Sequence, residues 1–142
     1  MSSTFESAQL VLKLYELRRD PVMRVARDWF FRKFNPSSIE DFLAVLDGAH
    51  NPHYRMVIGY WDMAAALVAH GAIDAAIFRD TNQEVLSVYA KIQPFLGELR
   101  SLTRAPEYLR NLERVIADMP GSEERLTVLR EQFRALAAKS ER

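Results

Sequence analysis

The run from Met56 to Phe78 reads MVIGYWDMAAALVAHGAIDAAIF and limits the possible folds more than any other stretch of the chain. Its length would suit a membrane span, which needs ~20 predominantly apolar residues. Asp62 lies inside the run, however, and a carboxylate at the centre of a bilayer costs ~2.5–3.5 kcal/mol. Gly71 then favours the end of a helix, and Asp74 favours the start of another. We therefore expect no membrane span but two helices of a water-soluble core, the first of them central to a bundle.

On a helical wheel this central helix has two different faces. One face carries large apolar side chains, and the other carries small residues that allow a neighbouring helix to approach closely. The large face consists of Tyr54, Ile58, Trp61, Ala65 and Val68, and the small face of Gly59, Asp62, Ala66 and Ala69. Because Asp62 would be partly buried, it should need a hydrogen-bond donor, which would be an arginine such as Arg100 or a backbone N–H.

Capping residues, glycines and prolines divide the rest of the chain into helices. The start signals are Asp20-Pro21 and Asn51-Pro52, Ser37 with Glu40, Thr81 with Glu84, and Ala105-Pro106. Pro94 should kink or split the helix that contains it. No stretch alternates between polar and apolar residues for long, so strands are not expected. The sequence predicts an all-α fold, a single domain over residues 1–142 built as an orthogonal or irregular bundle of seven to eight helices.

The composition excludes several classes of function. The chain has no cysteine, which rules out disulfides and thiolate chemistry and suits a cytoplasmic location. Nineteen basic residues balance nineteen acidic ones, so nucleic-acid binding is unlikely on charge alone. His50 with His53, and His70 with Asp74, are too few ligands for a structural metal site. We expect no metal and no cofactor, and the chain lacks the motifs of nucleophilic or phosphate-binding enzymes.

The run YWDMAAALVAHGAIDAAIF also resembles the signature of a bacterial all-helical domain family of unknown function. In that signature an aromatic pair and an acid precede an apolar helix, which is followed by Gly-x-Ile-Asp. The stretch IQPFLGELRSLTRAPEYLRNLERVI is similar to the C-terminal half of the same family, so the resemblance covers roughly residues 51–116. It implies an all-helical fold with no established activity. By position it singles out Trp61, Asp62, Gly71, Asp74 and Arg100, with Asp62 where glutamate is more common.

The second predicted helix has an interface composition. From Arg18 to Lys33 the chain carries six basic and two acidic residues. On a helical wheel Phe31 lies among Arg24, Arg27 and Asp28 on the solvent-facing side. The residues expected to face the core are Val22, Val25, Ala26, Trp29 and Phe30. An exposed aromatic flanked by arginine is typical of protein interfaces, although Phe31 could instead be covered by a neighbouring helix.

These features favour a non-catalytic, soluble interaction domain that associates with itself as a dimer. The interface candidates are Arg24, Arg27, Asp28 and Phe31. The alternative is a small-molecule-binding or enzymatic domain with a pocket beside Trp61, Asp62 and Arg100, in which Asp62 would have a shifted pKa. A third hypothesis, weak binding of nucleic acid by the basic second helix, is disfavoured by the neutral net charge.

Overall fold

The computed structural model describes residues 2–140 and contains, over that range, eight helices and no strand. The helices are α1 (Thr4–Arg18), α2 (Pro21–Arg32), α3 (Ile39–Leu46), α4 (Asn51–Ala69), α5 (Ala75–Thr81), α6 (Glu84–Leu102), α7 (Arg110–Ala117) and α8 (Ser122–Ser140). The predicted all-α fold of seven to eight helices is confirmed. None of the helices in this range combines the length and the apolar character that crossing a membrane requires.

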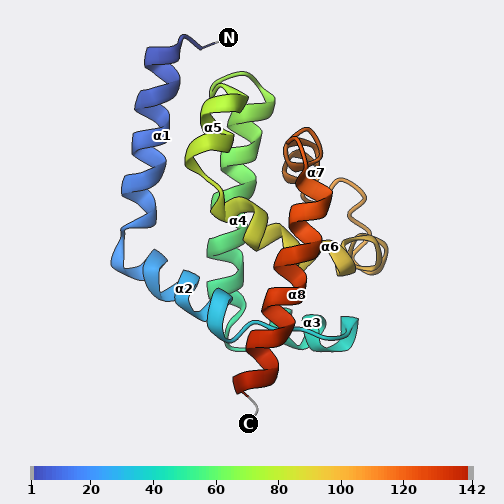
Figure 1. Cartoon of the computed structure of the whole chain (residues 1–142). Coiled ribbons are helices and arrows are strands. Elements are labelled where there is room, and N and C mark those ends of the chain that lie inside the picture. Colours follow the sequence, from blue (N-terminus) through green and yellow to red (C-terminus); the bar gives the residue numbers. More distant parts are fainter. Residues whose placement is uncertain (1, 141–142) are drawn as a thin grey trace.

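Helix α4 lies at the centre of the bundle, as its sequence predicts. It packs against α2 on one side and α7 on the other, while α6 packs against α8 (Figure 1). Trp61 and Tyr54 of α4 are among the largest fully buried side chains. A cluster of aromatic rings joins α2, α3 and α4, where Phe34 lies 5.3 Å from Phe42 and 5.8 Å from Tyr54 between ring centroids. This core fixes α2 firmly along its inner side.

Helix α1 stands at the edge of the bundle and contacts α5 and α2 (Figure 1). Its buried residues are few: Ser7, Val11 and Leu14. Hydrogen bonds supplement this narrow apolar contact. The backbone N–H of Asp74 donates to Ser7 Oγ at 2.9 Å, and the Tyr60 hydroxyl donates to the carbonyl of Leu14 at 2.7 Å. One side of α1 is therefore held by α4 and by the start of α5, and the rest faces solvent.

Several predicted helix ends are confirmed by their capping contacts. Asp20 accepts hydrogen bonds from the first turn of α2, with Val22 N at 2.9 Å. Gly71 has φ +80°, the left-handed conformation that follows many helices and that glycine adopts without strain. Asp74 caps α5 through Ile77 N at 3.0 Å. The central apolar run is thus two helices joined by a tight turn.

Other predicted starts are wrong by one to a few residues. The cap of α3 is Ser38 instead of Ser37, and α4 follows His50, which makes no side-chain cap. The paired Thr81 and Glu84 do not cap α6, whose N-cap is Gln83. Residues 106–109 form a turn, so α7 begins at Arg110 instead of just after Ala105. Helix α6 continues through Pro94 without being split.

Candidate functional site

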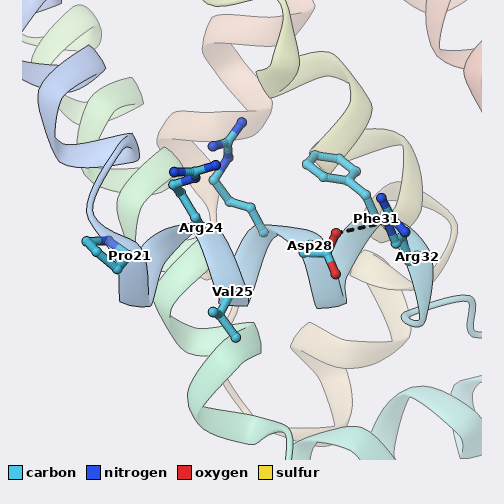
Figure 2. Close-up of a pocket in the computed structure, with 7 residues that line it drawn as sticks. Pro21, Arg24, Val25, Asp28, Phe31 and Arg32 are labelled. Carbon is cyan, nitrogen blue, oxygen red and sulfur yellow. Dashed lines mark ion pairs between the residues drawn. The ribbon is translucent and has the colours of Figure 1, made fainter.

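The outward side of α2 borders an open hollow of roughly 600 Å³. We call this surface the α2 outer face; its residues are Pro21, Arg24, Val25, Arg27, Asp28, Phe31 and Arg32. Figure 2 shows Arg24 and Phe31 projecting from one side of the helix and Val25 from the other. All four residues predicted as interface candidates therefore lie together on one surface.

The inward side of α2 differs from the predicted one. Val22 and Val25 were expected to face the core, but they are 62% and 58% exposed. Ala26, Trp29 and Phe30 are buried as predicted, and Met23 is buried as well. Two overlapping rows of α2 are apolar at helical spacing, and a wheel cannot decide which of them the neighbouring helices cover. The prediction was therefore right for three of the five inward residues and wrong for the two valines.

Phe31 is correspondingly less exposed than predicted. It is half-buried and packs against the core, edge-on to Phe30 with 5.5 Å between ring centroids. Arg27 is also half-buried, and its Nε donates to Glu84 Oε2 of α6 at 3.0 Å. This hydrogen bond to a carboxylate raises the pKa of Arg27. Both side chains thus anchor α2 to the bundle while their outer edges remain part of the α2 outer face.

The remaining charges on the α2 outer face differ in their pairing. Asp28 accepts from Arg32 one turn later, with 2.8 Å between Arg32 Nε and Asp28 Oδ1 (Figure 2). This pair is exposed, and pairs of this kind contribute little stability. Arg24 has no carboxylate partner within residues 2–140. The face therefore presents one unpaired cation beside a carboxylate that can change partners at low cost.

Trp61, one of the three pocket candidates, belongs to the core. Its ring is fully buried, edge-on to Tyr60 at 4.8 Å, and the Arg18 guanidinium lies 5.3 Å from the ring centroid. Its indole Nε1 has no hydrogen-bond partner within the described part of the chain. Burial against aromatic and cationic neighbours accounts for this residue without a ligand.

Asp62 and Arg100 do not form the ion pair that we predicted. Arg100 instead donates to the carbonyl of Tyr108 at 2.9 Å and to the carboxylate of Glu113 at 3.2 Å. Glu113 lies one turn into α7, which brings it within reach of Arg100 near the end of α6. The long arginine side chain thereby joins α6 to α7, and no cation of the described part of the chain pairs with Asp62.

Asp62 instead faces the start of α7. Burial raises the pKa of its carboxyl group, and the backbone N–H of Leu112 in the first turn of α7 opposes that shift. The amide is close enough to act on the charge, yet Oδ1 has no hydrogen bond of normal geometry within residues 2–140. Leu109, the N-cap of α7, is left-handed with φ 58° and gives no side-chain cap. A carboxylate near a helix N-terminus is favourable, so Asp62 adds to the negative charge that Glu113 supplies in the first turn of α7.

The two neighbouring histidines pack against an aromatic ring. His50 stacks on Trp29 with ring centroids 5.2 Å apart, and His53 lies 5.9 Å from the same ring. Within residues 2–140 no three histidine or acidic side chains are grouped as a metal would require. These histidines therefore have a packing role beside the aromatic cluster.

A buried lysine is the functional group that sequence reasoning missed. Lys91 of α6 is 7% exposed, and its Nζ donates to the carbonyls of Phe30 at 2.9 Å and Phe34 at 2.8 Å. It also reaches the carbonyl of Phe31 and Asn35 Oδ1, each at 3.2 Å. Burial lowers its pKa to about 8. The position of a lysine within the apolar run VYAKIQPF was the available signal.

Lys91 acts as a cap for the carboxyl end of α2. Carbonyl groups in the last turn of a helix lack backbone donors, and the helix dipole favours a cation there. The ring of Phe133 from α8 covers the ammonium, with Nζ 4.5 Å from its centroid. One side chain thus connects α2, α6 and α8.

Comparison with known families decides the affiliation of this fold. The sequence model of a family described as a domain of unknown function, DUF4760, matches residues 3–119. The chain belongs to the DUF4760 family. This confirms the predicted membership of an all-helical family without an assigned activity. No curated protein and no solved structure matches the chain.

The DUF4760 match extends well beyond the segment of residues 51–116 on which the resemblance was based. It spans α1 to α7 and ends before α8 begins at Ser122. The α2 outer face and Lys91 lie within the matched DUF4760 region. Phe133, which covers Lys91, lies outside it.

Proposed function

We propose that this DUF4760 domain is a non-catalytic interaction module that forms a dimer through the α2 outer face. The observation that carries the proposal is the order of side chains along that face. The exposed Pro21 and the half-buried Phe31 lie at its two ends, and its unpaired Arg24 lies one turn from Asp28. Two copies of such a face can satisfy each other, as a two-fold symmetric interface requires.

The pairing follows from antiparallel packing of α2 on α2 of a second copy. Side chains at 21, 24, 28 and 31 have the three-and-four spacing of a helix-packing seam. If the two-fold axis crosses the seam midway between residues 24 and 28, Arg24 of each chain meets Asp28 of the other. Pro21 of each chain then meets Phe31 of the other. Both ends of the seam become apolar contacts, and the centre contains two ion pairs.

A charge exchange tests this arrangement. Arg24→Asp and Asp28→Arg should each weaken the dimer, because each places like charges opposite one another. The double variant Arg24→Asp/Asp28→Arg should restore association, because the two charges are exchanged together. Sedimentation equilibrium of the purified chain measures all three. Arg110→Asp, which changes an exposed ion pair on α7, is the matched control and should leave association unchanged.

Two further variants examine the apolar contribution. Phe31→Ala should weaken the dimer because it removes the ring opposite Pro21. Asp28→Ala should weaken it as well, through loss of the central ion pairs. A wild type that remains monomeric at millimolar concentration, or a dimer that is indifferent to the charge exchange, would refute the proposal.

A further inference from the structure

A second exposed surface lies on α1, away from the α2 outer face. We call it the α1 stripe and define it as Phe5, Ala8, Leu12 and Tyr15. Phe5 is 71% exposed, Leu12 62% and Tyr15 51%, and Ala8 is exposed as well. None of the four belongs to the set that attaches α1 to the bundle, which is Ser7, Val11 and Leu14. Phe5, Leu12 and Tyr15 therefore lie outside the packed core of residues 2–140.

The spacing of the α1 stripe indicates what could cover it. Intervals of three, four and three residues form a narrow seam along a helix, the arrangement that receives a second helix in coiled-coil packing. Helix-in-groove recognition likewise uses anchors at such intervals. An exposed apolar row of this kind, rimmed by polar residues, marks an interaction site more often than a scattered single side chain does. The geometry favours a helical partner over an extended peptide.

The positive charges at one end of the α1 stripe indicate which end of a partner helix would carry acidic residues. Arg18 and Arg19 lie at the carboxyl end of α1, and both stack on Tyr15, with guanidinium carbons 5.9 Å and 5.6 Å from its ring centroid. Neither arginine forms an ion pair with a carboxylate in the described residues. Acidic side chains on a docked helix would pair with them beside the apolar seam.

The same flank argues against a lipid surface as the occupant. Glu16 is exposed and lies beside Tyr15 on the edge of the seam, where it would face anionic headgroups. Membrane-surface helices are instead rich in basic residues on their polar face and have a broad apolar one. The α1 stripe is narrow, and Glu16 borders it.

We infer that the α1 stripe docks an amphipathic helix of a partner protein. That helix carries apolar residues at three-and-four spacing and acidic residues at the end that meets Arg18 and Arg19. This inference concerns a surface separate from the α2 outer face, so it stands independently of dimer formation.

The test uses the full chain and a fluorescent three-heptad peptide. The peptide carries leucine at the seam positions and glutamate on the flanks, and a second peptide has lysine in place of every glutamate. Fluorescence anisotropy should show saturable binding of the glutamate peptide and at least tenfold weaker binding of the lysine peptide. Leu12→Gln should weaken binding of the glutamate peptide at least tenfold. Arg19→Gln, which leaves the contact of Arg18 with Trp61 in place, should reduce the preference for glutamate.

Controls separate this surface from the others. Val128→Gln changes an exposed apolar residue of α8, and Arg24→Asp changes the α2 outer face; both should bind the peptide as the wild type does. Circular dichroism of each variant confirms that the exposed substitutions leave the fold intact. Absence of peptide binding by the folded wild type, or binding that survives Leu12→Gln, would overturn the inference.

Two other outcomes would assign the α1 stripe to a different occupant and also overturn it. In the first, Leu12→Gln abolishes self-association in sedimentation, which would make a second copy the occupant. In the second, the wild type but not Leu12→Gln sediments with phosphatidylglycerol vesicles, which would make it a lipid surface. In either case Arg24→Asp, studied in parallel, still reports separately on the α2 outer face.

Discussion

Replacing Lys91 by methionine tests the most unusual interaction in the fold. Methionine keeps most of the side-chain volume but removes the ammonium that donates to three carbonyls at the end of α2. Hydrogen bonds to a charged group contribute roughly 1.5–3 kcal/mol each, so the three together contribute roughly 4.5–9 kcal/mol. The substitution leaves those carbonyls without a donor in a largely buried place.

The burial of the charge opposes this loss. A pKa of about 8 in place of 10.5 corresponds to about 3 kcal/mol of desolvation at neutral pH, at ~1.36 kcal/mol for each pH unit. Methionine relieves that cost. The difference predicts that Lys91→Met lowers the free energy of unfolding by about 1.5–6 kcal/mol. Urea unfolding followed by the fluorescence of Trp29 and Trp61 measures it, and Lys33→Met, at an exposed position of the same helix end, should change it by less than ~0.5 kcal/mol.

The pH dependence supplies a second, signed test. Between pH 8 and pH 10.5 the unfolded chain holds the Lys91 proton more tightly than the folded chain does. Stability from this residue therefore rises as the pH increases through that window, and the full desolvation cost applies below it. The gap between wild type and Lys91→Met should widen from pH 8 to pH 10. A methionine variant as stable as the wild type, with a constant gap, would refute the reasoning.

Three further predictions follow from the described contacts. Asp62→Asn should change stability at pH 7 by less than about 1 kcal/mol, since no cation among residues 2–140 pairs with Asp62. The raised pKa of Asp62 means that stability is lost as pH rises from 3.8 through the folded value, and chemical denaturation across that range should show this slope only in the wild type. Gly71→Ala should lower stability by about 1–2 kcal/mol because φ is +80°, whereas Gly59→Ala, which meets no atom within 4 Å, should raise it by up to ~1 kcal/mol; thermal unfolding of both decides this. Arg27→Gln should cost roughly 1.5–3 kcal/mol, and Arg27→Gln/Glu84→Gln should recover part of it in urea unfolding, because the double variant leaves no lone half-buried charge.

The all-α architecture was predictable because apolar spacing and capping residues are local signals. Gly71 and Asp74 needed only their own neighbours along the chain to reveal a helix end and a helix start. The cap of α3 was harder to predict, because Ser37 and Ser38 have equivalent hydroxyls. In the structure Ser38 is the N-cap. The start of α7 at Arg110 follows the turn of residues 106–109, and no capping residue in the sequence indicated it.

The burial and the partners of the candidate-site residues depended on tertiary contacts, which a helical wheel does not include. Lys91 is buried because three carbonyls of a distant helix end converge on it. Val25 is exposed because the helices next to α2 cover the row of Met23 and Phe30 instead. Arg100 was assigned to Asp62 by sequence, but the closer carboxylate of Glu113 binds it. In each case the outcome was set by which helices are adjacent, and that information lies in the packing.

The attachment of α1 also has a consequence for how the protein moves. A helix held by a few apolar side chains and two or three hydrogen bonds opens at a lower free energy than the core does. Its backbone amides should therefore exchange with deuterium first, as a cooperative unit distinct from α4 and α7. Each detachment of α1 would break the Ser7–Asp74 and Tyr60–Leu14 hydrogen bonds together. It would also expose to solvent the face of α4 around Tyr60. Trypsin would then cleave the peptide bond between Arg18 and Arg19 while α1 is detached and the rest of the bundle is still folded.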